Sequence, residues 1–273
     1  MDPQTAPELT PFELTTPSQT LRGWTAGAVT DSPRTPVLFV HPINLQGLAW
    51  AQVATALTGE RFCLLPDMRG HGRSTAKGPF GVDAWVEDLL AVLDHFGVTR
   101  CHVVGGSLGG TLAVALADRA PERVVSIAAF GSALALAGHD LEAVLDALRD
   151  NGVRRTFEHG IPEVTVAPGT PQQIVSMIVD MTNPNDVPTV SAIWRATIDT
   201  DITNLAESIA VPALVVTGEC DRTCPPDQGK AMAERLGTSF ALMPGIGHLP
   251  MLEAPQPTAA LVRDFLDAQE APR

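Results

Sequence analysis

The stretch that decides the fold is VVGGSLGGTLAVAL, residues 103–116. Its first half is β-branched and apolar, as in a buried strand, and its second half is rich in Ala and Leu, as in a helix. Between the halves, Gly105-Gly106-Ser107-Leu108-Gly109 fits the pattern G-x-S-x-G. A strand that turns abruptly into a helix strains its corner residue, and flanking glycines remove Cβ atoms that would clash. The stretch therefore predicts a nucleophilic Ser107, exposed above the strand end near the positive end of the helix.

Short apolar runs bounded by turn-forming or charged residues recur on both sides of this stretch. They cover residues 36–41, 61–66, 100–105, 123–130, 212–218 and 238–243. Such runs are typical of strands that are buried on both faces of a parallel sheet. Helical patterns alternate with them at 48–57, 82–96 and 108–120. The alternation predicts an α/β fold with helices on both faces of the sheet, and FELTT and LRGWTAGAV predict an antiparallel hairpin at one edge.

The alternation breaks between about Ser132 and Glu207, where the sequence becomes helical throughout. The segments are LEAVLDALRDN, VRRTFEHG, TPQQIVSMIVDMT and VPTVSAIWRATID, with Pro and Gly at their joints. We therefore expect a core domain made of residues 1–131 and 206–273, with a helical cap at 132–205 inserted into it.

Charge and composition narrow the class of protein. The chain has 273 residues, of which 45% are hydrophobic, so it can bury a substantial core. Its formal net charge of −13 argues against binding to nucleic acid or to an anionic membrane surface. The opening MDPQTAPELT lacks the basic and apolar regions of a secretory signal, so we expect a cytoplasmic protein. The four cysteines are then expected to be free thiols, and Cys220 and Cys224 lack the second ligand pair that zinc needs.

A serine hydroxyl needs a base to take its proton. The sequence GIGHLPMLEAPQ supplies His248 between the last strand candidate and the final helix. VVTGECDRTCPP follows an earlier strand candidate and supplies Asp221, with Glu219 as an alternative closer to the strand end. We favour Asp221 as the carboxylate that would hold the imidazole tautomer and stabilise the imidazolium.

These motifs, with HPINLQG (41–47) and PDMRGHGRS (66–74), resemble the α/β-hydrolase superfamily in their order and over nearly the whole chain. The resemblance implies an eight-stranded, mostly parallel sheet with a cap after the sixth strand. It also implies an oxyanion hole made by the backbone N–H groups of Ile43 and Leu108. Family members commonly have Gly where this chain has Pro42, which puts the conformation of that loop in question, and Asn44 is an alternative side-chain donor. PDMRGHGRS is interpreted as a loop that supports the site from beneath.

The choice of reaction follows from the nucleophile and its neighbours. A serine disagrees with the aspartate of haloalkane dehalogenases and epoxide hydrolases and with the cysteine of dienelactone hydrolases. Carbon–carbon bond hydrolases usually carry Asn and Trp where this chain has Gly106 and Leu249. The D-x-x-x-P-P pattern of Asp221–Pro226 is most similar to 3-oxoadipate enol-lactonases and small carboxylesterases.

The resemblance thus implies hydrolysis of a small-molecule ester or lactone through an acyl-enzyme, with no metal or organic cofactor. A carbon–carbon bond hydrolase, an acyltransferase or perhydrolase, and a ligand-binding module of the same fold stay open as alternatives. The sequence leaves the oligomeric state unknown. Candidate pocket residues, each of which could equally serve the core, are Phe130, Met177 and Trp194, together with Asn44.

Overall fold

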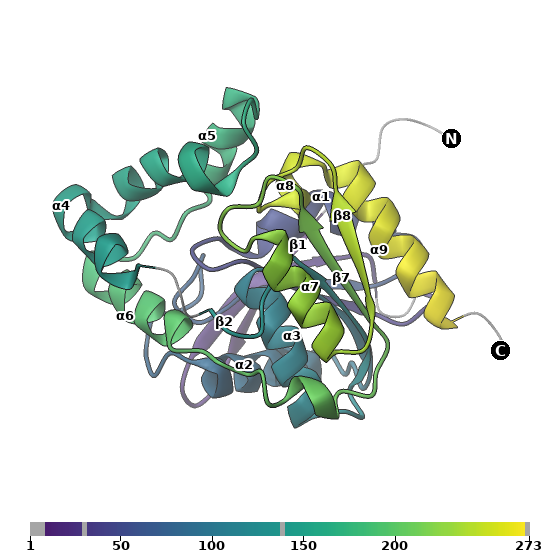
Figure 1. Ribbon diagram of the computed structural model, residues 1–273. Coiled ribbons are helices and arrows are strands. Elements are labelled where there is room, and N and C mark those ends of the chain that lie inside the picture. The colour runs from purple at the N-terminus through teal and green to yellow at the C-terminus, as the bar shows by residue number, and fades with distance from the viewer. Residues whose placement is uncertain (1–8, 29–31, 137–139, 271–273) are drawn as a thin grey trace, which may run out of the picture.

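An eight-stranded sheet forms the centre of the computed structural model, which describes residues 9–28, 32–136 and 140–270 (Figure 1). The strands are β1 (Thr10–Thr15), β2 (Thr20–Ala26), β3 (Val37–Val40), β4 (Cys63–Asp67), β5 (Cys101–Gly106), β6 (Val124–Phe130), β7 (Ala213–Gly218) and β8 (Ser239–Met243). Their order in the sheet is β1-β2-β4-β3-β5-β6-β7-β8. The hairpin β1–β2 joins β4 in antiparallel fashion, and all pairs from β4 to β8 are parallel. The predicted α/β fold, with its edge hairpin, is confirmed.

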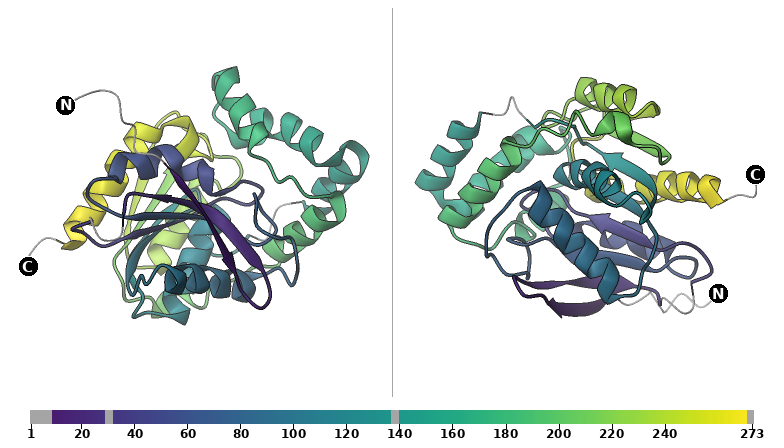
Figure 2. Two further views of the ribbon diagram at one scale, coloured as in Figure 1. Left: turned by 180° about the vertical axis from the view of Figure 1, so that it is seen from behind. Right: turned by 90° about the horizontal axis from the view of Figure 1, so that it is seen from below.

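Helices cover both faces of the sheet (Figure 2). Those of the core are α1 (Ala51–Leu57), which a 3-10 turn η2 (Gly47–Trp50) precedes, α2 (Val82–His95), α3 (Leu108–Arg119), α7 (Pro226–Arg235), α8 (Pro250–Glu253) and α9 (Pro255–Glu270). No helix within the described ranges combines the length and the apolar character needed to cross a bilayer.

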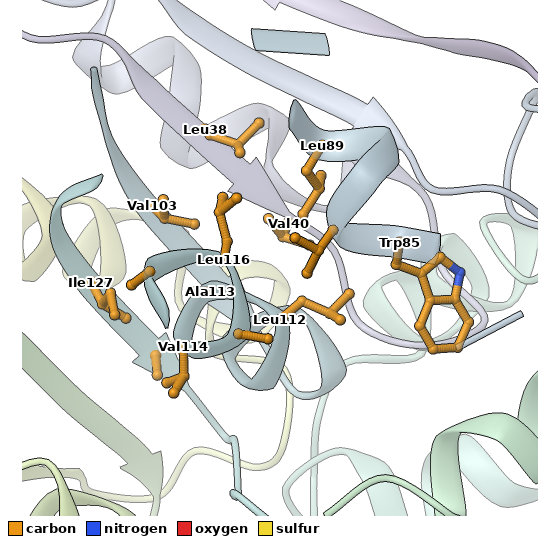
Figure 3. Packing of buried hydrophobic residues seen from close by; sticks show 14 of the residues in the cluster. Leu38, Val40, Trp85, Leu89, Val103, Leu112, Ala113, Val114, Leu116 and Ile127 are labelled. Atoms are coloured by element: carbon orange, nitrogen blue, oxygen red, sulfur yellow. The ribbon is translucent and has the colours of Figure 1, made fainter. Parts of the chain in front are cut away.

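Strand β3 is apolar at every position because both of its faces are buried. Leu38 and Val40 belong to a core cluster that contains residues of α2, α3 and α7. Val37 and Phe39 belong to a second cluster, which contains residues of α1 and α9. Successive side chains of a strand point to opposite faces, so a strand covered on both sides has no position for a polar residue. Figure 3 shows the first of these layers, where strand side chains pack against Leu112 and Leu116 of α3.

The segment between β6 and β7 is helical, as predicted. It contains α4 (Leu141–Gly160), a π-helical turn η3 (Ile161–Thr165), α5 (Gln172–Asp180), α6 (Val187–Ile198) and a 3-10 turn η4 (Ala206–Ser208). Gly152 has a non-helical backbone (φ 74°, ψ 168°) and breaks α4, so residues 141–151 and 153–160 are distinct helical pieces. Helices α4, α5 and α6 lie together beside the sheet (Figure 1).

The four cysteines are free, and Cys63, Cys101 and Cys224 are buried. Burial raises the pKa of the Cys63 and Cys101 thiols to about 12, so both stay protonated at neutral pH. They act as small apolar residues of the core.

A partly buried ion network fixes the C-terminal helix α9 to the residues that flank the sheet. The fully buried Arg61 donates to Glu270 Oε1 at 2.9 Å and to Asp267 Oδ1 at 2.9 Å. Burial raises the pKa of Glu270, but hydrogen bonds from Arg61, Thr35 and His102 outweigh burial, and the net pKa falls from 4.5 to about 2. The ionised carboxylate is therefore the form that stabilises the fold.

We expect Glu270→Gln to lower the free energy of unfolding at neutral pH by about 2 kcal/mol, because Arg61 loses a charged acceptor. The folded-state pKa lies below the ordinary value, so this stabilisation is present above pH 4.5 and is lost as the pH falls toward 2. Urea unfolding at a series of pH values measures both effects, and the variant should lose less stability in that window. Glu13→Gln removes an exposed ion pair with Arg22 and serves as the control, with a loss below about 1 kcal/mol. Equal losses in the two variants would contradict the assignment.

Candidate active site

Ser107 is the single residue between β5 and α3, at the corner that the sequence predicts. Its φ of 52° and ψ of −123° place its backbone in a conformation that residues other than glycine rarely adopt. The glycines around it permit a close approach of helix and strands. A Cβ on Gly105 would overlap the carbonyl of Gly109, and one on Gly109 would overlap the carbonyl of Val40. The motif therefore holds the first turn of α3 directly against the end of β3.

Asp221 and His248 form a buried hydrogen-bonded pair in the loops after β7 and β8. His248 Nδ1 donates to Asp221 Oδ2 at 2.8 Å. Asp221 Oδ1 also accepts the backbone N–H groups of Thr223 and Cys224, at 2.9 and 2.8 Å. Three donors therefore fix the carboxylate and, through it, the orientation of the imidazole. Glu219 is exposed, and its Oε2 accepts the N–H of Gly245 instead.

The end of β6 connects Ser107 to this pair. The Ser107 N–H donates to the carbonyl of Phe130 at 2.8 Å. The next residue, Gly131, has a φ of 54°, and a Cβ there would lie 3.0 Å from Asp221 Oδ2 and 3.2 Å from His248 Nδ1. All three side chains thus lie at the carboxyl ends of parallel strands, where open α/β sheets bind ligands. Sequence reasoning missed Gly131, whose only signal is its place directly after a strand.

Glu253 holds the backbone on both sides of His248 and was also missed. Its Oε2 accepts the N–H of Gly247 at 3.0 Å, and its Oε1 accepts the N–H of Leu249 at 2.9 Å. The same Oε2 accepts the N–H of Ala167, which follows η3, at 2.8 Å. The signal in the sequence is one acidic residue within the otherwise apolar stretch LPMLEAP.

The loop after β3 is held in place by His41. Its Nδ1 donates to the carbonyl of Pro42 at 2.7 Å, and its Nε2 accepts the N–H of Met68 at 3.0 Å. Burial, and to a smaller extent the neighbouring His71, lowers the pKa of His41 well below its ordinary value. The imidazole is therefore neutral at physiological pH, and its two hydrogen bonds set the tautomer.

Two backbone N–H groups are available at the site, one in this loop and one at the start of α3. A Cβ on Gly106 would lie 3.2 Å from Pro42 Cγ, so the loop is adjacent to the serine motif. Within residues 9–28, 32–136 and 140–270, neither the N–H of Ile43 nor that of Leu108 donates to a protein acceptor. The Leu108 N–H belongs to the first turn of a helix, whose N–H groups have no partner inside the helix.

The PDMRGHGRS segment is held by internal polar contacts. Asp67 accepts the backbone N–H groups of Gly47 and Arg73, at 2.7 and 2.9 Å. Arg69 makes a buried bidentate pair with Asp88, at 2.6 and 2.7 Å. Burial lowers the pKa of His71 to about 4. Asp67 and Arg69 therefore serve internal contacts, whereas His71 Nε2 is buried without a partner among the described residues.

A cavity of about 390 Å³ lies between the core loops and the helical segment, within the usual range for small-molecule sites. From the core it is lined by residues 42–45, Arg222, Thr223, His248 and Leu249. From the helical segment it is lined by residues of α4, η3, α5 and α6, among them Phe157 and Trp194.

The structure brings two of the four candidate pocket residues to this cavity. Asn44 and Trp194 line it, and Trp194 stacks on Phe157 with 6.5 Å between ring centroids. Phe130 is instead fully buried in the core, where its ring packs edge-on against Trp50. Met177 lies on α5 beside a separate, shallow groove. Phe157 was not predicted as a pocket residue.

A second serine–histidine–acid group occurs elsewhere, near the amino ends of β5 and β6. His102 Nδ1 lies 2.7 Å from Ser126 Oγ, and its Nε2 lies 3.2 Å from Glu270 Oε1. Ser126 and His102 are fully buried, and burial lowers the pKa of His102 to about 4. With no access for a substrate, this group is structural.

Comparison with known proteins agrees with this architecture. A family model described as "Alpha/beta hydrolase family" matches residues 37–261. Rhodomycin D methylesterase DauP of Streptomyces sp. (strain C5) is 29% identical over 278 residues, which cover 88% of this chain and 93% of that protein. A pimeloyl-[acyl-carrier protein] methyl ester esterase of Chromobacterium violaceum is 30% identical over 246 residues, covering 85% of this chain and 94% of that protein.

The fold also matches solved structures over nearly its full length. The enol-lactonase from Burkholderia xenovorans LB400 superposes with a TM-score of 0.85 at 24% identity, covering 93% of this chain and 99% of the other. The family model spans most of the chain. The chain belongs to the alpha/beta hydrolase family.

Proposed function

We propose that the protein hydrolyses small-molecule carboxylic esters or lactones, with Ser107, His248 and Asp221 as its catalytic triad. The observation that carries the proposal is the buried Asp221–His248 pair. Like the strained Ser107, this pair lies at the carboxyl ends of the parallel strands. His248 also lines the cavity. The two relatives reported above are both named as methyl ester esterases, which supports an ester as the bond that is cleaved.

The mechanism begins with His248. With Nδ1 occupied by Asp221, Nε2 is the nitrogen that accepts the proton of Ser107 as its oxygen attacks the carbonyl. The buried carboxylate of Asp221 stabilises the imidazolium that forms. His248 then returns the proton to the departing alcohol, which leaves an acyl group on Ser107. In the second half, His248 takes a proton from water, and the water oxygen attacks the acyl-enzyme. The bond between the acyl group and Ser107 then breaks, His248 returns the proton to the Ser107 oxygen, and the acid is released.

The negative oxygen of each tetrahedral intermediate would be met by the N–H groups of Ile43 and Leu108. Preorganised backbone donors stabilise such charge because they need no rearrangement when it develops. Pro42 has no N–H to donate, but the proposed donor is the N–H of the next residue, Ile43. The bonds of His41 to Pro42 and Met68 fix the loop in place for this task.

We further propose that the segment 132–205 is a cap that selects the substrate and contributes no triad residue. Its helices supply much of the cavity wall, while the triad candidates come from core loops. A cover of this kind shields the site from bulk solvent and shapes the space for the acyl group.

Ser107→Ala should lower kcat by roughly 10⁴-fold or more while the protein stays folded, because the nucleophile is removed. Turnover of a methyl ester and labelling by a fluorophosphonate probe measure the loss, and circular dichroism checks the fold. Ser126→Ala removes the serine of the buried structural group and is the matched control, which should still be labelled. Labelling that survives Ser107→Ala but not Ser126→Ala would refute the proposal.

Asp221→Asn should lower kcat by roughly 10⁴-fold, the scale known for the analogous change in a serine protease. The Asn carbonyl can keep the bonds from Thr223 and Cys224, but its amide would face His248 Nδ1 as a second donor. That clash disfavours the tautomer that leaves Nε2 free to act as a base. Glu219→Gln is the control, since an amide oxygen still accepts from Gly245, and its kcat/KM should change by less than about threefold. A larger effect at Glu219 than at Asp221 would show that the acid is misassigned.

A further inference from the structure

Asn44 occupies a turn position that glycine fills without strain. The N–H of Leu45 donates to the carbonyl of Pro42 at 3.2 Å, which closes a turn with Ile43 and Asn44 at its centre. Asn44 has a φ of 63°, and a turn with a positive φ only at its third residue takes glycine or asparagine there. The turn by itself therefore requires no side chain at this position.

The side-chain amide of Asn44 is nevertheless buried without a protein partner. The residue is 4% exposed. Its Oδ1 is fully buried and accepts from no group of the described residues, whereas Nδ2 has no acceptor there either but retains accessible surface. An unpaired buried amide costs free energy that glycine would avoid. Asn44 lines the cavity, so the acceptor for Nδ2 is a group that enters the cavity. A substrate that displaces water from Nδ2 has to bring that acceptor itself.

Other polar side chains of the cavity wall are satisfied or solvated. Three hydroxyls donate to backbone carbonyls, those of Thr156, Thr182 and Thr223. Asp140 and Arg222 also line the cavity, but both are exposed, so bulk water solvates their charges. Asn44 differs from these residues because its amide is buried and has an unused donor.

The place of Asn44 in the loop decides which oxygen of the substrate meets Nδ2. It directly follows Ile43, whose N–H is proposed above to meet the carbonyl oxygen of the ester. The turn lies against the serine motif, since a Cβ on Gly106 would lie 3.2 Å from Pro42 Cγ. The carbonyl oxygen of an ester is a stronger acceptor than its alkoxy oxygen, whose lone pair is delocalised into the carbonyl group. It also gains negative charge as the serine attacks.

We propose that Asn44 Nδ2 donates a hydrogen bond to the carbonyl oxygen of the bound ester, as a third donor beside the N–H groups of Ile43 and Leu108. The inference rests on the ester hydrolysis proposed above and adds a catalytic residue to it. The turn holds the amide in place before the charge develops, so the donor needs no rearrangement. It acts in both halves of the reaction, because a tetrahedral oxyanion forms in each half.

The test uses two replacements of Asn44 that remove the donor in different ways. Asn44→Gly removes the amide and adopts a positive φ freely. Asn44→Asp keeps the size of the side chain but has no N–H at neutral pH. With enzyme in excess over p-nitrophenyl butyrate, the release of p-nitrophenolate measures the rate of acylation. Asn44→Gly should slow acylation about 100-fold, the scale for one lost oxyanion donor, and Asn44→Asp at least as much, because its charge repels the oxyanion.

Two controls separate the lost donor from a disturbed structure. Asn151 is an exposed asparagine outside the cavity lining, and Asn151→Gly should change the acylation rate less than about twofold. Urea unfolding should show Asn44→Gly to be at least as stable as the wild-type protein, because the variant no longer buries an unpaired amide.

Slow acylation in both Asn44 variants supports the proposal. Slow acylation in Asn44→Gly alone would come from a loosened loop and overturns it. Unchanged acylation with slower steady-state turnover would assign the amide to the water of the second half and overturns it as well. A wild-type protein that releases no p-nitrophenolate overturns the proposed hydrolysis together with this inference, whereas full activity in the Asn44 variants overturns this inference alone.

Discussion

The first turn of α3 approaches β3 so closely that a side chain at Gly109 would overlap the carbonyl of Val40. This contact forces the chain to reverse within one residue after β5, and that residue is Ser107. It also brings the N–H of Leu108 to the loop that carries Ile43. Both the strain at the serine and the two available N–H groups therefore depend on the same small residues. The interior packs too densely to let helix and strand separate by the width of a methyl group without loss elsewhere.

Sequence reasoning predicts the sheet well, because strands buried on both faces are apolar at consecutive positions and are bounded by breakers. The run at 100–105 lies within one residue of the observed β5, and the runs for β3 and β7 are similarly close. The paired motifs also predict which loops supply the histidine and the acid. Sequence reasoning favours Asp221 over Glu219, and the fold shows that Asp221 is the carboxylate that faces His248.

The pocket was less predictable for a physical reason. An apolar side chain has the same signature whether it lines a cavity or fills a core, so Phe130 and Trp194 were equivalent in sequence although only Trp194 lines the cavity. The roles of Gly131 and Glu253 depend on backbone contacts between distant segments, which leave no local pattern. The Ser126–His102–Glu270 group also shows that residue types alone do not identify a functional site. Its residue types resemble a triad, but Ser126 and His102 are not among the residues that line the cavity, whereas His248 is.

The backbone around His248 is bonded to the helical segment as well as to the core. The His248 N–H donates to the carbonyl of Thr165, and Glu253 accepts the N–H of Ala167. The stretch around Thr165 and Ala167 therefore helps to hold the loop that carries His248, although it belongs to the helical segment. If helical segments were exchanged between family members, this stretch would have to come from the same protein as the core domain. The foreign segment would then have to begin after Ala167. A chimera joined at the ends of β6 and β7 would place His248 on a foreign backbone support as well as beside a foreign cavity wall.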